Sequence, residues 1–224
     1  MKKQANIAVT ETVIKLREMM CSGKLYNPIT WRYYDGNMSP CGQADCSKIM
    51  NDYQRNCRKA MELYNSLPQT EKCDKRREKL LTEIFGKSNS FRRIEAPFHA
   101  NYGGTHTALK GMFYAGFNLT LIEDGQIEIG DKTMIGPNVT ISTAEHPVDK
   151  DIRELGQGIL YNKKVTIGRN VWIGANVTIL SGVTIGDNCV IGANSLITKN
   201  TIIPNNKLAV GVVSPNNVDL LKDI

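Results

Sequence analysis

One histidine stands in an interruption of an otherwise periodic sequence. The segment ISTAEHPVDK, residues 141–150, contains His146, and the 224-residue chain has three histidines in all. Aliphatic residues recur every six positions before and after this segment, and between them the pattern stops for about twenty residues. A neutral imidazole accepts a proton near neutral pH, since its unperturbed pKa is about 6.5. His146 could therefore carry acid–base chemistry, although an isolated histidine is more often structural.

The periodic sequence predicts the architecture that must position this histidine. From residue 165 the chain reads VTIGRN VWIGAN VTILSG VTIGDN CVIGAN SLITKN. Its isoleucines are spaced by six residues without a slip: Ile167, Ile173, Ile179, Ile185, Ile191, Ile197 and Ile203. Upstream, the same step joins Ile129, Ile135 and Ile141. This period fits neither a helix nor simple strand alternation, and it is typical of a parallel β-helix built from hexapeptides.

Such a β-helix explains the other recurring residues. Each hexapeptide would form a short strand and a tight turn, with its isoleucine pointing inward. The residue two positions earlier, such as Val165 or Val171, is also aliphatic, as strand alternation requires. Glycine and asparagine at the corners supply turn conformations. We expect about four or five coils over residues 95–205, capped at their ends because solenoid coils contact only their neighbours.

The first ninety residues predict a helical region that would form one of these caps. Apolar residues three or four positions apart indicate helices over residues 10–21 and 45–67, and a third helix that ends at Gly86. Residues 27–42 are rich in aromatic and turn residues and are expected to form an irregular loop. The predicted division is a helical region, residues 1–90, and a β-helix, residues 91–224, with a protruding loop at 143–164 and a C-terminal tail.

Composition narrows the classes of partner. Hydrophobic residues make up 41% of the chain and charged residues 22%, which is a soluble globular balance. The net charge of +6 could attract nucleic acid or an anionic small molecule such as a nucleotide or coenzyme, and without a basic run we expect no nucleic-acid partner. The sequence shows no signal-peptide core and no apolar stretch of about 18 residues. We therefore expect a cytoplasmic protein without membrane contact.

The cysteines and histidines do not predict a metal site. A cytoplasmic location disfavours disulfides, so we expect free thiols that mostly pack in the core. Cys41 and Cys46 lie close together, but no second pair completes a zinc pattern. A γ-type carbonic anhydrase, another hexapeptide protein, needs three histidines on a metal, and His99 and His106 lie outside the clear coils. We expect that no metal is required.

The stretch from about residue 114 to 199 resembles the maltose and galactoside O-acetyltransferases, which are hexapeptide-repeat acyltransferases. The matching segments are YAGFNLTLIED, IGPNVTISTAEHPVD and the repeats from VTIGRN to TKN, with a weaker match at LREMMCSGKLYNP. The resemblance implies a homotrimer of left-handed parallel β-helices with an N-terminal helical cap. It also implies that acetyl-coenzyme A binds between subunits and that its acetyl group passes to a hydroxyl of a sugar or sugar-like acceptor.

The same resemblance implies roles for particular residues. His146 would be the general base that removes the acceptor's hydroxyl proton. Positions on the acceptor side are matched by Asp124, Asn101 and Gly116. Positions on the coenzyme side are matched by Trp172, Ala175, Ala193, Thr198 and Lys199. The Ala175 N–H would stabilise the oxyanion, and Lys199 suits the coenzyme phosphates. The alternatives are a turn role for Asp124 and a surface role for Trp172.

Several positions depart from the family pattern. The family has asparagine at Gly116, serine or aspartate at Asn101, aspartate near Asn27 and Pro28, and glutamate at Gln157. The tail lacks the arginine of a G-x-P-x-R ending, which predicts weaker coenzyme binding, and residues 28–44 are longer than usual. Two alternatives therefore stay open. One is an acetyltransferase with a non-sugar acceptor, such as an antibiotic or a nucleotide-sugar, and the other is a non-catalytic trimeric binding protein.

Overall fold

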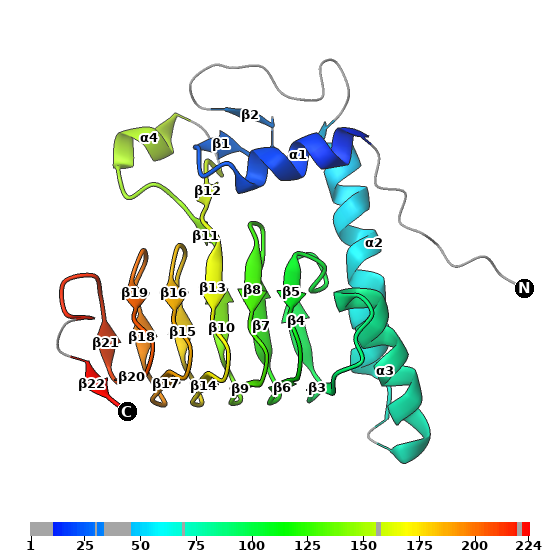
Figure 1. The fold of residues 1–224 in the computed structure, drawn as a ribbon. Helices are drawn as coiled ribbons and strands as arrows, with labels where there is room; N and C mark the ends of the chain where they lie inside the picture. Colours follow the sequence, from blue (N-terminus) through cyan, green and yellow to red (C-terminus); the bar gives the residue numbers. More distant parts are fainter. Residues whose placement is uncertain (1–10, 30, 34–45, 69, 156–157, 219–220) are drawn as a thin grey trace, which may run out of the picture.

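The computed structural model describes residues 11–29, 31–33, 46–68, 70–155, 158–218 and 221–224 (Figure 1). It confirms the parallel β-helix with helices at its N-terminal end. Figure 1 shows α2 and α3 at one end of the coil stack and β21 and β22 at the other. Within the described ranges, no helix is both long and apolar enough to cross a membrane.

The β-helix has three faces, each a parallel sheet; the first two have one strand from each of the six coils, and the third has one strand from each of the first five. The first face contains β3 (Arg92–Ile94), β6 (Phe113–Ala115), β9 (Thr133–Ile135), β14 (Trp172–Ile173), β17 (Val190–Ile191) and β20 (Lys207–Ala209). The second face contains β4 (Phe98–Ala100), β7 (Leu119–Ile122), β10 (Thr140–Ser142), β15 (Thr178–Ile179), β18 (Leu196–Ile197) and β21 (Val212–Val213). The third face contains β5 (Thr107–Leu109), β8 (Ile127–Ile129), β13 (Val165–Ile167), β16 (Thr184–Ile185) and β19 (Ile202–Ile203). At the chain end, β22 (Lys222–Asp223) pairs antiparallel with β20.

The number of coils differs from the sequence expectation of four or five. The second face has six strands, so the stack has six levels, and the first of them begins at Arg92. Coil one places Ile94, Phe98 and Leu109 in the core instead of isoleucines at a constant step. The six residues 101–106 separate β4 from β5, and this insertion hides the first coil from a search for a six-residue period.

The interior of the stack is a column of aliphatic side chains. Ile167 pairs in register with Ile185, and Ile185 with Ile203 one coil further on. All three are about 1% exposed, so water is excluded along the whole axis. The corners repeat as well, because asparagines there adopt positive φ and hydrogen-bond to each other between coils: Asn118 to Asn138, Asn176 to Asn194, Asn170 to Asn188, and Asn188 to Asn206.

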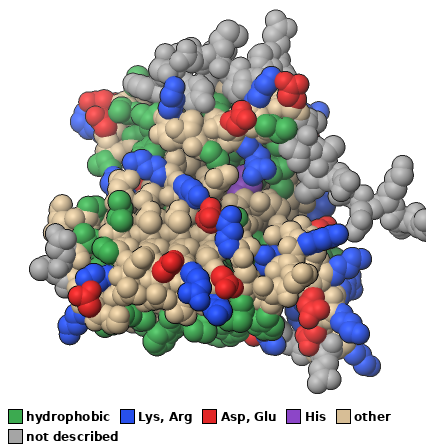
Figure 2. Space-filling view, in the orientation of Figure 1, with side chains coloured by type: hydrophobic (Ala, Val, Ile, Leu, Met, Phe, Trp, Pro, Cys, Tyr) green, Lys and Arg blue, Asp and Glu red, His purple; other side chains and the backbone are tan. Residues whose placement is uncertain are grey.

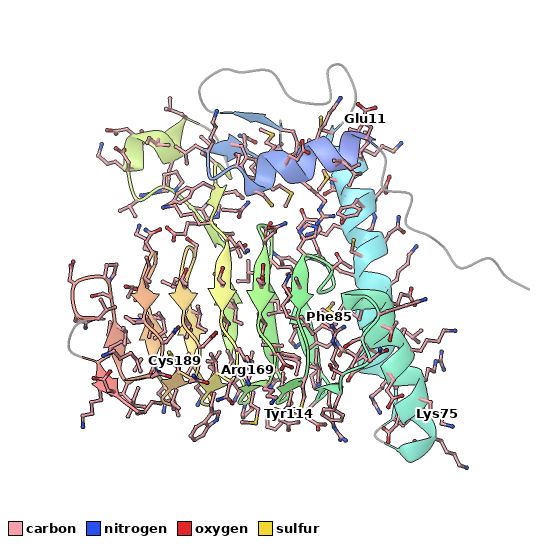
Figure 3. All side chains as sticks on the ribbon, in the orientation of Figure 1. Glu11, Lys75, Phe85, Tyr114, Arg169 and Cys189 are labelled. Carbon is pink, nitrogen blue, oxygen red and sulfur yellow. The ribbon has the colours of Figure 1, made fainter. Side chains whose placement is uncertain are left out.

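The outward side chains differ between the faces. On the first face Tyr114, Met134 and Trp172 stand in register on neighbouring strands and are 39%, 47% and 55% exposed. On the second and third faces the outward positions are mixed: threonines such as Thr140 and Thr166 alternate with residues such as His99 and Glu128. Figure 2 shows hydrophobic side chains gathered along the lower edge of the β-helix, where Figure 3 labels Tyr114. The first face is therefore the apolar one.

The N-terminal region packs its helices against two different parts of the β-helix. Helices α2 (Cys46–Ser66) and α3 (Glu71–Phe85) add apolar side chains to the main core over coil one. A second core forms around α1 (Glu11–Cys21) and the short strand β1 (Tyr26–Asn27), which pairs with β2 (Arg32–Tyr33). Tyr102 of coil one and Leu160 of the protruding loop belong to this second core. The helices therefore cover both the end of the stack and one of its corners.

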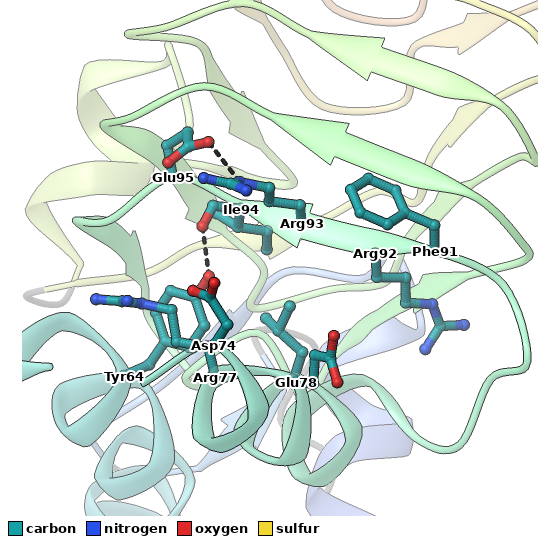
Figure 4. Close-up of a pocket in the computed structure, with 10 residues that line it drawn as sticks. Tyr64, Asp74, Arg77, Glu78, Phe91, Arg92, Arg93, Ile94 and Glu95 are labelled. Carbon is teal, nitrogen blue, oxygen red and sulfur yellow. Dashed lines mark hydrogen bonds and ion pairs between the residues drawn. The ribbon is translucent and has the colours of Figure 1, made fainter. Parts of the chain in front are cut away.

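A pocket of about 110 Å³ lies between α3 and β3 (Figure 4). Its polar side chains largely serve the cap itself. Arg77 donates hydrogen bonds to the carbonyls of Leu67 and Pro68, and Tyr64 donates to the carbonyl of Ile94. The pocket is therefore part of the junction between the cap and the first coil.

One expectation about the cysteines is wrong. Cys46, the first residue of α2, is disulfide-bonded, and its partner lies outside the described residues, as does Cys41. The expectation of free thiols rested on the redox conditions of the cytoplasm, and those conditions do not determine whether the chain brings two cysteines close enough to bond. The free thiols are Cys21, Cys57, Cys73 and Cys189. In the part of the chain that the structure describes, no group of three His, Cys, Asp or Glu side chains could hold a metal ion.

Candidate active site

Three successive coils are expanded at the same corner, between the second and third faces. A regular coil takes six residues between buried positions there, as from Ile179 to Ile185. In coils one to three the step is longer: nine from Ala100 to Leu109, eight from Leu121 to Ile129, and 26 from Ile141 to Ile167. Because coils stack in register, the three excursions lie beside one another. We call this corner, formed by residues 101–106, 123–126 and 143–164, the loop corner.

The longest excursion carries His146. It leaves β10 as β11 (Ala144–Glu145), forms the short helix α4 (Lys150–Glu154) and returns as β12 (Tyr161–Asn162), antiparallel to β11. The His146 side chain is exposed, and its Nδ1 lies 2.8 Å from the carbonyl oxygen of Ile159. A carbonyl only accepts, so Nδ1 carries the proton and donates it. The lone pair of a neutral ring is then at Nε2, as a general base requires.

A carboxylate and an amide stand at the same corner. Asn101 donates from Nδ2 to Asp124 Oδ2 at 2.7 Å, and Arg58 of α2 donates to the Asn101 carbonyl at 2.8 Å. Burial raises the pKa of Asp124, while the bond from Asn101 and the charges of Arg58 and His146 oppose that rise. The structure therefore places Asn101, Asp124 and His146 at the same loop corner, where Asn101 and Asp124 are in contact and the His146 charge acts on Asp124.

The neighbouring Glu123 was missed by sequence reasoning. Its carboxylate is fully buried and accepts the backbone N–H groups of Asn101, Tyr102 and Gly104 at 2.8–2.9 Å. Burial raises its pKa to about 7, and the backbone donors oppose that rise. Glu123 folds the 101–106 segment around itself and so fixes the backbone of Asn101. A signal was present, because Glu123 continues the inward alternation of Leu119 and Leu121 one residue beyond the end of β7.

A buried stack of aromatic rings lies beside Glu123. The His106 ring stacks on Tyr102 with centroids 4.3 Å apart, and Tyr53 of α2 lies beside both rings. Nδ1 of His106 contacts the Glu123 carbonyl at 2.9 Å, and Nε2 contacts the Tyr53 hydroxyl at 3.2 Å. Burial lowers the pKa of His106 to about 3. His106 is therefore a neutral structural residue that supports the loop corner.

The predicted coenzyme residues flank the second face. Trp172 and the corner residues Ala175 and Ala193 lie where the first face meets the second, and Ala175 and Ala193 occupy successive coils. Thr198 and Lys199 follow β18 at the opposite edge, in line with the loop corner. Lys199 Nζ lies 3.5 Å from Glu145 Oε2, next to His146 in the chain. Within one chain the predicted coenzyme residues therefore do not gather at one place, but lie toward the two opposite edges of the second face.

Gly116 does not lie with the other predicted acceptor residues. It follows β6 at the corner of the first and second faces, across β7 from Asp124. A Cβ at this position would be 2.8 Å from the Pro137 nitrogen and 3.1 Å from the Gly136 carbonyl carbon. In this structure a side chain at Gly116 would therefore press against the backbone of the next coil, which fills the space beside it.

The remaining departures from the family pattern have local roles where they are described. Asn27 Oδ1 accepts the N–H of Ile29 at 2.8 Å, as in an Asx turn. In the tail, Asn217 accepts the Ser214 N–H at 2.7 Å and donates to the Val212 carbonyl at 2.9 Å, while Asn216 is exposed. Gln157 and most of residues 28–44 lie outside the described residues.

Comparison with known proteins gives concordant matches. The family described as bacterial transferase hexapeptide (six repeats) matches residues 164–199. A galactoside O-acetyltransferase of Lactococcus lactis subsp. lactis (strain IL1403) is 46% identical over 91 residues, which are 41% of this chain and 43% of that protein. The matched segment thus spans less than half the length of that relative.

Two solved structures match over nearly the whole chain. A maltose O-acetyltransferase from Clostridium difficile 630 is 33% identical with a TM-score of 0.72, covering 94% of this chain and 96% of that one. A galactoside acetyltransferase in complex with coenzyme A is 33% identical with a TM-score of 0.72, covering 93% of this chain and 89% of that one.

Proposed function

The chain belongs to the maltose and galactoside O-acetyltransferase family of hexapeptide-repeat acyltransferases, and we propose that it transfers an acetyl group from acetyl-coenzyme A to a hydroxyl of a sugar or sugar-like acceptor. One observation carries the proposal. His146 holds its Nδ1 proton against the Ile159 carbonyl at the loop corner, where the Asp124–Asn101 pair also lies. A proton acceptor next to a hydroxyl-binding carboxylate is what acetylation of an alcohol requires.

His146 would act as the general base. Its Nε2 takes the acceptor's hydroxyl proton while the hydroxyl oxygen attacks the thioester carbonyl carbon. The imidazolium that forms keeps its bond from Nδ1 to the Ile159 carbonyl, which stabilises the positive charge. General-base catalysis of this kind contributes roughly 10²–10⁴-fold to the rate. The proton then leaves with the coenzyme thiolate as the tetrahedral intermediate collapses.

Asp124 would orient the acceptor. Its carboxylate has four lone-pair sites and uses one of them on Asn101 Nδ2, so it keeps capacity for acceptor hydroxyls. The Asn101 side chain retains its carbonyl oxygen as a further acceptor. Glu123 and Arg58 fix the backbone of Asn101, and the Asn101 side chain in turn holds Asp124, before an acceptor arrives. Such preorganisation lowers the entropy cost of holding the hydroxyl near the base.

The coenzyme would bind along the second face. Coenzyme A is present in the structure of the similar galactoside acetyltransferase, and the corresponding fold in this chain carries Lys199 and Trp172 at the two edges of that face. An ammonium at Lys199 suits phosphate or carbonyl oxygens of the coenzyme. The Ala175 N–H has no hydrogen-bond acceptor among the described residues, which is consistent with a role at the oxyanion.

The division of the site supports a homotrimer. His146 and Trp172 stand at different edges of the second face, so a groove between two copies would complete one site from both edges. The apolar column of Tyr114, Met134 and Trp172 offers a surface that association would bury. Closed threefold symmetry buries such a face in every copy at once.

Thiol release from acetyl-coenzyme A across a panel of sugars and other hydroxyl compounds tests the activity. Acceptor-dependent release is expected, and His146→Ala should lower turnover by about 10²-fold or more. The matched control is Val148→Ala, since Val148 is 80% exposed in the same loop and should leave turnover at the parent rate. Coenzyme binding without release for any acceptor would favour a non-catalytic binding protein, and release with a non-sugar compound would reassign the acceptor.

A further inference from the structure

The residue before His146 joins the protruding loop to the regular coils. The carboxylate of Glu145 accepts a hydrogen bond from the Tyr161 hydroxyl at 2.6 Å and another from the Ser181 hydroxyl. The same carboxylate lies 3.5 Å from Lys199 Nζ. Tyr161 belongs to the returning strand β12, whereas Ser181 and Lys199 belong to coils four and five. One side chain therefore contacts both the loop and the two coils that follow the loop in the chain.

Glu145 is built to stay in place. Its side chain is 16% exposed, compared with 45% for Lys199. Burial opposes its ionisation, but the bonds from Ser181 and Tyr161 and the Lys199 charge outweigh burial and lower its pKa. The carboxylate is therefore ionised at neutral pH, and it is bound by the Tyr161 and Ser181 hydroxyls and the Lys199 ammonium. An ion held by two hydroxyls and an ammonium exchanges partners less readily than an exposed pair.

The geometry links this anchor to the candidate base. Glu145 pairs with Tyr161 in the β11–β12 ladder, and His146 Nδ1 bonds to Ile159 on the opposite side of the same loop. The imidazole is thus fixed relative to the loop, and Glu145 fixes the loop relative to Ser181 and Lys199. Without that contact the end of the loop stays attached, because Asn162 bonds to Met20 and Tyr26, and Lys163 bonds to Gly182 and Asn200 of coils four and five. Glu145 is therefore the contact to those coils that lies directly beside His146.

We propose that Glu145 is a positioning residue, which holds His146 at a set place over the coenzyme groove by fixing its loop to Ser181 and Lys199. The proposal rests on the function proposed above for His146. An ammonium has three donors, so Lys199 binds a coenzyme oxygen while it still contacts Glu145. One carboxylate thereby sets the base and the coenzyme-side lysine relative to each other. Misplacement of a reacting group by about 1 Å costs about 10²-fold in rate.

Two substitutions separate the parts of this role. Glu145→Ala removes all three contacts, and it should lower kcat by tenfold or more with the Kd of coenzyme A within about twofold of the parent. Glu145→Gln keeps acceptor and donor atoms for Tyr161 and Ser181 and loses only the charge opposite Lys199. We expect it to recover most of kcat. The control is Glu154→Gln, an exposed glutamate of α4 in the same loop, which should match the parent.

Hydrogen exchange of the intact protein gives a readout that needs no activity. Glu145→Ala should speed amide exchange in residues 144–146 and 159–162 by about tenfold, with an unchanged melting temperature because the coil core is untouched. Parent-like exchange in Glu145→Ala would overturn the proposal, and so would fast exchange with parent kcat. If the parent acetylates nothing, the proposed function fails, and the exchange data still decide whether Glu145 fixes the loop.

Discussion

Replacing His106 with asparagine should change how the protein responds to acid. His106 has a pKa of about 3 in the folded protein and about 6.5 when unfolded. A depressed folded pKa stabilises the fold above pH 6.5, and that stability is lost as the pH falls toward 3, since the unfolded chain takes up the proton first. The loss is about 1.4 kcal/mol for each pH unit below 6.5. It should therefore reach roughly 3 kcal/mol by pH 4.5.

Glu123 changes stability in the opposite direction over the same range. Its folded pKa of about 7 lies above the ordinary value of 4.5, so its contribution to stability is full below pH 4.5 and is lost as the pH rises to 7. In the parent the two effects largely cancel between pH 4.5 and 6.5. In His106→Asn the contribution of Glu123 remains alone, so the variant should gain stability on acidification while the parent stays nearly flat.

Chemical denaturation of parent and variant at pH 7.5, 6.5, 5.5 and 4.5 measures this difference. At pH 7.5 the variant is expected to be less stable by about 1–3 kcal/mol, from the lost contacts with Tyr53 and Tyr102. That deficit should shrink by about 1.4 kcal/mol per pH unit below 6.5. A deficit that stays constant down to pH 4.5 would show that His106 is not held neutral by burial and would refute the argument.

Three further predictions concern the core, the acceptor and the coenzyme. Ile173→Ala should lower the free energy of unfolding by about 2–5 kcal/mol in denaturation experiments, because Ile173 is fully buried, whereas Ile202→Ala, at 64% exposed, should stay within about 0.5 kcal/mol of the parent. Asp124→Asn should raise KM for the acceptor by about tenfold and leave the Kd of coenzyme A unchanged in titrations, and a large coenzyme effect would contradict its place on the acceptor side. Asn216→Arg should tighten coenzyme A binding by about tenfold if a charge is missing from the tail, and calorimetry showing no gain would mean that the tail does not reach the groove.

The regular coils were predictable because their signal is local. Each six-residue step between isoleucines corresponds to one strand and one corner. Ile167, Ile185 and Ile203 lie in that register in the structure. Coil one was missed because an insertion at 101–106 breaks the step and Phe98 and Leu109 replace isoleucine in the core. Period therefore identifies a solenoid reliably only where its corners have constant length.

The site was predictable in part for a different reason. His146 was visible as a polar residue in a gap of the repeat, and Asp124 and Asn101 came from the family resemblance. Glu145 and Glu123 were not found, since each acts through partners that are distant in sequence, such as Ser181 for Glu145 and Asn101 for Glu123. Gly116 was placed with the acceptor, but only the stacked coils show that Pro137 fills the space beside it.

In the regular coils the asparagine ladders join residues that are 18 positions apart, one coil after the next. When the chain is pulled along the axis from its C-terminal end, the same set of hydrogen bonds must therefore break again at each coil. After β22 separates from β20, each event releases one coil, or about 60 Å of contour length at 3.3–3.6 Å per residue. The regular coils four and five should extend under tension in equal steps, whereas coils one to three should give longer steps because the segments at their loop corner are longer.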